Sequence, residues 1–146
     1  MNKFGAAWIY LSGSIALIGA LIHLAAMFGG ISWYIFFNAP PKVVESVRAG
    51  TWLAPISTAI IVILMAICAA YAFSSVGLIR RLPLLRLILA GMTFVCLLRA
   101  LILLPLLINH PGLRNTFEYV ASIVWGIAGA GFMIGLRFSG PAKQSS

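Results

Sequence analysis

Four long and continuously apolar runs constrain the fold of this chain more than any other feature. They cover residues 6–29, 52–73, 84–108 and 117–138. A helix of roughly 20 residues, rising about 1.5 Å per residue, crosses a hydrocarbon core of about 30 Å. Continuous rather than alternating apolar residues favour helices over barrel strands, because a helix satisfies its own backbone hydrogen bonds in lipid. The runs predict an all-α fold, an integral membrane four-helix bundle.

The composition agrees with a single transmembrane domain over residues 1–146. Of these residues 62% are hydrophobic and only 8% are charged, and a soluble domain of this length cannot bury that much apolar surface. The first run follows Lys3, as a secretion signal would, but it is too long for the apolar core of a signal peptide. We therefore expect it to remain in the protein as the first helix.

The basic residues predict how the helices are oriented, because cytoplasmic loops usually carry the excess of Lys and Arg. One side of the predicted bundle holds six of them and the other side three. The six are Lys3, Arg80, Arg81, Arg86, Arg137 and Lys143, and the three are Lys42, Arg48 and Arg114. This count places both termini in the cytoplasm, and we expect a bacterial inner (plasma) membrane.

The net charge of +8 is mostly explained by this topology. The three arginines of residues 80–86 would also attract anionic lipid headgroups. Nucleic acid is not an expected partner, because the charges lie at the helix ends and accompany no nucleic-acid-binding motif. The expected partner is membrane lipid, with a second copy of the chain or another membrane protein as further candidates.

The first loop, GGISWYIFFNAPPKVVESVRAG, is rich in aromatic residues of the kind found at the headgroup level. After its two prolines, three valines fall on one face of a possible short helix, while Glu45 and Arg48 fall on the other. We expect an amphipathic extracytoplasmic segment that covers the bundle as a lid. An interfacial anchor without any role in ligand binding is the alternative.

Arg99 interrupts the third run, within the segment TFVCLLRALILLPLLI. It lies ten residues before Asn109, which is about 15 Å along a helix and close to the bilayer midplane. An arginine that faces lipid at this depth costs at least about 2.5 kcal/mol on insertion scales. We therefore expect Arg99 to face the protein interior or a hydrated cavity and to have an anionic partner.

Only two acidic residues, Glu45 and Glu118, are available as that partner. Glu118 begins the fourth run, where a carboxylate also suits the positive end of the helix dipole. Its side chain leans away from Arg99, so a direct pair requires a tilted helix, a bend at Pro105 or an intervening water. Two interpretations stay open: Arg99 holds the bundle together through the two acids and free carbonyls, or it binds a ligand.

Other polar residues are expected to face the same outer half of the bundle. His23 lies on the small-residue face of the first helix, and Glu118, Ser122 and Trp125 share a face of the fourth. The candidate ligand-binding residues are His23, Arg99, Glu118, Ser122 and Trp125, with Glu45 and Arg48 in the covering loop. For His23 alone a hydrogen bond to another helix is the more common role, and for Trp125 packing is.

Reactive side chains are few, and they form no recognised catalytic or metal-binding motif. His23 and His110 lack the spacing of a metal or haem site. Cys68 and Cys96 form no CxxC pair, so we interpret them as packing thiols. The glycines of GIAGAGFMIG indicate close helix packing, including the Gly131–Gly135 pair, rather than phosphate binding. We expect no metal and no cofactor.

These observations favour a small polytopic membrane protein that binds an amphiphilic or anionic ligand in the outer half of the bundle. A lipid or an isoprenoid-like molecule, with its head directed at Arg99, fits the expected excess of cations. An accessory or assembly subunit of a larger membrane complex, with no chemistry of its own, is the first alternative. A small membrane enzyme or transporter acting on a lipophilic substrate is the second, with His23 or Glu118 as the proton-transfer candidate.

Overall fold

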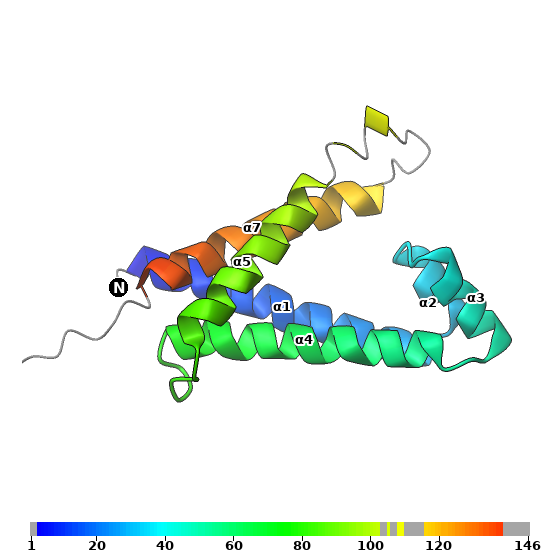
Figure 1. Cartoon of the computed structure of the whole chain (residues 1–146), viewed down its shortest axis with the longest axis horizontal. Coiled ribbons are helices and arrows are strands. Elements are labelled where there is room, and N and C mark those ends of the chain that lie inside the picture. The colour runs from blue at the N-terminus through cyan, green and yellow to red at the C-terminus, as the bar shows by residue number, and fades with distance from the viewer. Residues whose placement is uncertain (1–2, 103–104, 106–107, 110–115, 139–146) are drawn as a thin grey trace, which may run out of the picture.

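The computed structural model describes residues 3–102, 105, 108–109 and 116–138. Four long helices and two short ones form this part of the chain (Figure 1). They are α1 (Lys3–Gly29), α2 (Ile31–Phe36), α3 (Pro41–Ala49), α4 (Leu53–Ser75), α5 (Leu85–Leu101) and α7 (Thr116–Phe138). Every regular element among the described residues is helical, so the predicted all-α class is confirmed.

Three of the long helices are long and apolar enough to cross a membrane, namely α1, α4 and α7. The described part of α5 is shorter, with 17 residues, and it ends at Leu101. The predicted third span continued to residue 108, over positions that lie partly outside the described residues. The four-pass membrane bundle therefore stays a prediction.

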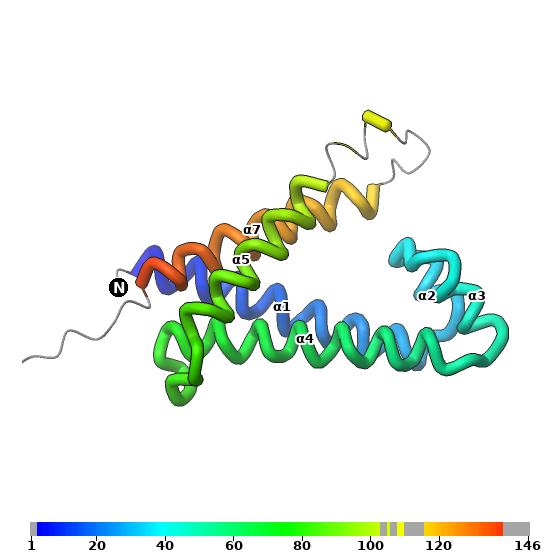
Figure 2. The backbone as a smooth tube through the Cα atoms, viewed as in Figure 1, coloured from blue at the N-terminus to red at the C-terminus, as the bar shows by residue number. Residues whose placement is uncertain are grey.

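The long helices form two antiparallel pairs, α1 with α4 and α5 with α7. The pairs meet where α1 packs on α7, near the start of α1 and the end of α7, and they diverge toward α2 and α3 (Figures 1 and 2). The core fills the narrow end, where Ile9, Leu89 and Phe132 are fully buried. The molecule is thus a wedge that is packed at one end and open at the other.

Small residues allow the helices of the narrow end to approach closely. A Cβ atom added at Gly131 of α7 would overlap the side chain of Ser12 and lie 2.6 Å from the carbonyl oxygen of Trp8, both in α1. A Cβ atom at Gly13 would lie 2.7 Å from a ring carbon of Phe73 in α4. The glycines thus serve close packing between helices, as the sequence indicated.

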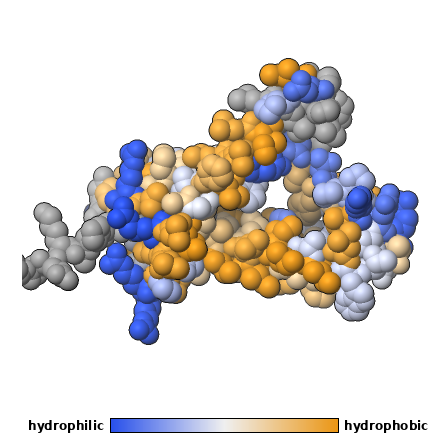
Figure 3. Space-filling view, viewed as in Figure 1, coloured by the Kyte–Doolittle hydropathy of each residue, from blue (hydrophilic) through white to orange (hydrophobic). Residues whose placement is uncertain are grey.

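The surface of the described helices is apolar over most of their length and hydrophilic at the two ends (Figure 3). Large apolar side chains are exposed on each long helix, for example Leu21, Ile63, Phe94 and Ile123. Isolated exposed apolar residues are normal on soluble proteins, whereas a surface of this extent is not.

Candidate functional site

The first loop folds into α2 and α3, and hydrogen bonds attach it to the start of α4. The Tyr34 hydroxyl lies 3.1 Å from the Thr58 hydroxyl oxygen, and both side chains are buried. The Ser46 hydroxyl oxygen accepts the backbone N–H of Ala54 at 3.0 Å, across the turn between α3 and α4. The first loop is therefore folded and hydrogen-bonded to α4. Its amphipathic helix α3 occurs where the valine pattern predicted it.

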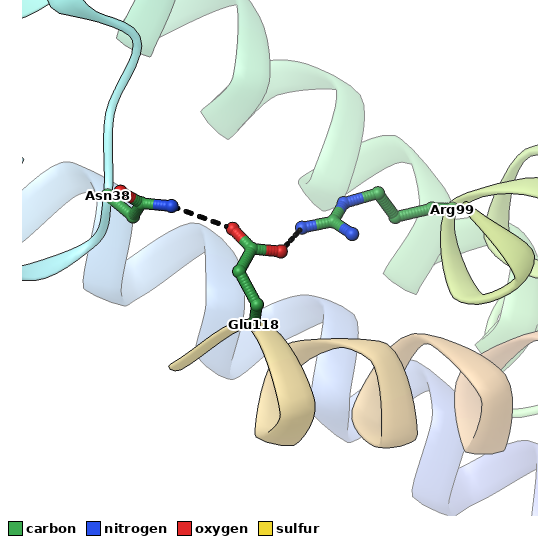
Figure 4. A network of polar contacts seen from close by, with 3 residues as sticks. All are labelled: Asn38, Arg99 and Glu118. Carbon is green, nitrogen blue, oxygen red and sulfur yellow. Dashed lines mark hydrogen bonds and ion pairs between the residues drawn. The ribbon is translucent and has the colours of Figure 1, made fainter. Parts of the chain in front are cut away.

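Glu118 joins three segments of the chain at the open end of the wedge (Figure 4). One of its carboxylate oxygens accepts a hydrogen bond from the Asn38 amide at 2.9 Å, and the other pairs with the Arg99 guanidinium at 2.9 Å. Asn38 follows α2 in a left-handed backbone conformation, with φ of 53°, which asparagine tolerates better than most residues. We call these three residues the carboxylate latch.

The ion pair of the latch is direct, although the sequence predicted that the Glu118 side chain leans away from Arg99. Arg99 lies in the last turn of α5 and Glu118 in the first turn of α7, and these two helices pack against each other. The Glu118 side chain is only 10% exposed, and that of Arg99 is 31% exposed. Pro105, where a bend was predicted, has neighbours outside the described residues.

An apolar cleft of about 380 Å³ separates the two helix pairs next to the latch. The hollow between the two arms is visible in the space-filling view (Figure 3). Its walls come from α1, α4, α5 and α7, and Phe37 of the first loop and Phe117 of α7 also line it. Exposed Ile18 and Val120 lie on its rim. The cleft is therefore open to the surroundings along the sides of the helices.

His23 is one of the polar residues that line the cleft. Its Nδ1 lies 2.8 Å from the Gly19 carbonyl oxygen, and because a carbonyl only accepts, Nδ1 must carry the hydrogen. The expected bond to another helix is thus replaced by a bond within α1. The ring stacks on Phe37 with centroids 6.4 Å apart, and Phe37 meets Phe117 edge-on at 5.8 Å.

The structure brings only part of the predicted site together. His23 and Trp125 line the cleft, and the latch residues Arg99 and Glu118 lie beside it. Ser122 is buried, and its hydroxyl oxygen has no hydrogen-bond partner among the described residues. Glu45 and Arg48 lie on the exposed side of α3, and neither lines the cleft.

Asn38 and Phe37 connect the first loop to α7, and neither is among the site residues that the sequence predicted. A signal for Asn38 was present, because it is a lone polar side chain between the aromatic run WYIFF and two prolines. Its partner was not predictable, since 80 positions separate it from Glu118.

Both cysteines line the same cleft, Cys68 from α4 and Cys96 from α5, and both are free thiols. Among the residues that the structure describes, no three His, Cys, Asp or Glu side chains are grouped as a metal site requires. The residues that line the cleft therefore offer apolar walls, two thiols, the imidazole of His23 and the indole of Trp125. Apolar walls with a few polar groups are typical of small-molecule sites.

Comparison of the chain with models of protein families, with curated protein sequences and with solved structures finds no match.

Proposed function

We propose that the chain is a four-pass membrane protein whose first loop and third loop lie on the outer side. The three spans, the apolar surface of the long helices and the hydrophilic ends support this placement. The start of α1 and the end of α7 lie at the same end of the wedge (Figure 1), as an even number of passes requires. That end also carries the basic residues Lys3, Arg80 and Arg86. Their excess favours a cytoplasmic location for this end of the wedge.

We propose further that the cleft holds the apolar chain of a membrane amphiphile, such as a lipid or an isoprenoid. The observation that carries this proposal is an apolar cleft of about 380 Å³ that opens sideways between the helix pairs. Its volume lies within the range of about 300–1,000 Å³ that is typical of small-molecule sites. In a bilayer such an opening faces the acyl chains, so a lipid chain can enter without crossing water.

Polar groups at the open end of the cleft suit the head of such a molecule. Arg99 donates to Glu118 through Nη2 alone in the described bond, whereas a guanidinium has five N–H donors. The partly exposed Arg99 can therefore bind an anionic head while its pair with Glu118 remains intact. Nε2 of His23 makes no hydrogen bond to the described residues, and because Nδ1 carries the hydrogen, Nε2 can accept a hydrogen bond from a hydroxyl group of the head.

A bulky residue in the cleft tests the proposal. Ala121 lines the cleft, whereas Ala25 lies on an exposed face of α1 outside it. Overfilling a packed site costs about 1–3 kcal/mol, so Ala121→Phe should lower the occupancy of a bound amphiphile about tenfold or more. Native mass spectrometry of the purified protein measures that occupancy, and the matched variant Ala25→Phe should leave it unchanged.

Two results would contradict the proposal, the first for the cleft and the second for the role of Arg99 as head-group contact. The first is that both alanine variants retain the same lipids as the wild-type protein. The second is that Arg99→Gln, which keeps polarity and removes charge, also retains them and only unfolds more easily. In that case Arg99 has a structural role alone. A stoichiometric protein partner without bound lipid would favour the accessory-subunit alternative.

A further inference from the structure

The loop between α4 and α5 is held in a defined shape at the narrow end of the wedge. The Ser74 hydroxyl donates to the Arg80 carbonyl oxygen at 3.1 Å and accepts the Leu82 N–H at 2.9 Å. The Tyr71 hydroxyl donates to the Pro83 carbonyl oxygen at 3.0 Å. Two side chains of α4 thus hold the backbone of this loop in place. The backbone positions of its arginines are defined by these hydrogen bonds.

This loop borders an open hollow of the surface, of about 930 Å³, which is lined by residues 80–87. Its lining residues include Arg80, Arg81 and Arg86, together with Leu84 and Leu87, which are 68% and 65% exposed. We call this hollow the arginine loop site. Its composition combines donors for an oxyanion with apolar side chains that can enter the edge of a bilayer.

The two acidic side chains of the sequence lie far from Arg80 and Arg86. The sequence contains only two acids, and both Glu45 in α3 and Glu118 at the start of α7 belong to the opposite end of the wedge (Figure 1). The end that holds the loop adds Lys3 and Arg137, and its hydrophilic side chains are visible in Figure 3. Neither Glu side chain is therefore placed to neutralise Arg80 or Arg86.

We propose that the arginine loop site binds the phosphate of an anionic phospholipid headgroup. A guanidinium matches the geometry of phosphate oxygens with paired N–H donors, and the two exposed leucines would contact the upper part of the acyl chains. A free phosphate ion would leave those leucines without a partner. This inference rests on the membrane placement proposed above, and it is independent of any ligand in the cleft between the helix pairs.

The test compares two double variants with the same change of net charge in lipid nanodiscs. Arg80→Gln/Arg86→Gln removes two cations of the site, and Lys42→Gln/Arg48→Gln removes two from α3, at the other end. Each basic residue near an anionic surface contributes about 1 kcal/mol, so the first variant should weaken binding of phosphatidylglycerol about 10- to 30-fold. The α3 variant should change it less than twofold, with bound lipid counted by native mass spectrometry.

Three results would overturn the assignment. An equal loss in both variants would mean diffuse charge attraction, and no loss in either would mean that the loop binds no headgroup. In nanodiscs of phosphatidylcholine alone, binding of millimolar inorganic phosphate that depends on Arg80 and Arg86 would assign a soluble phosphate instead. If the wild-type protein does not enter nanodiscs at all, the membrane placement itself is contradicted, which separates the two failures.

Discussion

At the scale of single residues, Glu118 has the greatest consequence, because its two carboxylate oxygens connect α7 to α5 and to the first loop. The carboxylate is mostly buried, whereas the guanidinium of Arg99 retains contact with the surroundings. Loss of one partner from a buried pair is costly, because the other charge keeps its desolvation penalty. The latch therefore stabilises the open end of a wedge whose core lies at the opposite end.

We predict that Glu118→Gln lowers the free energy of unfolding by about 1–3 kcal/mol. The value lies below the 3–5 kcal/mol that is typical of fully buried pairs, because Arg99 is partly exposed. Thermal unfolding in detergent measures the change. Addition of Arg99→Gln to this variant should recover part of the loss, since no unpaired charge then remains. Glu45→Gln is the matched control, on the exposed side of α3, and should change stability by less than about 0.5 kcal/mol.

At the scale of helices, close packing between α1 and α7 depends on the absence of a side chain at Gly131. Alanine is favoured over glycine in a helix by about 0.5–1 kcal/mol, so a Gly→Ala change is stabilising wherever space permits. At Gly131 the added Cβ would overlap the Ser12 side chain and press on the Trp8 carbonyl. At Gly91 of α5 nothing lies within 4 Å of it.

We predict opposite signs for these two substitutions. Gly91→Ala should stabilise the protein by up to about 1 kcal/mol, and Gly131→Ala should destabilise it by about 1–3 kcal/mol, because α1 and α7 must move apart. Thermal unfolding of both variants in the same detergent compares them directly. Equal effects of the two changes would show that the α1–α7 contact is looser than the structure describes.

At the scale of the whole molecule, the wedge places α2 and α3 at one end and the loop between α4 and α5 at the other (Figure 1). Ser32 of α2 and Leu78 of the second loop are both exposed. In a protein that spans the membrane, these two positions lie on opposite sides.

We predict that Ser32→Cys and Leu78→Cys react with a membrane-impermeant thiol reagent from opposite sides. The reagent should label Ser32→Cys in intact cells and Leu78→Cys only after the membrane is opened, because the excess of basic residues near Leu78 favours the cytoplasm. Replacement of Cys68 and Cys96 by alanine removes background labelling from the cleft. Labelling of both positions from one side would disprove the topology.

The helical class, the position of the apolar helices, the amphipathic α3 and the small-residue faces could be predicted from the sequence. These features depend on short-range properties: the length of an apolar run, the spacing of Val43, Val44 and Val47, or a glycine every few residues. The need of Arg99 for an acidic partner was also predictable, because the cost of an unpaired charge in an apolar run follows from its position alone.

The tertiary structure alone decided which groups meet. Asn38 reaches Glu118 across 80 positions of sequence, and the cleft exists because the α5–α7 pair diverges from the α1–α4 pair. Such an arrangement depends on how side chains of four helices fill space at the narrow end, around Ile9 and Phe132. Periodicity identifies the face that a helix buries, but the crossing angle is set by contacts between distant residues.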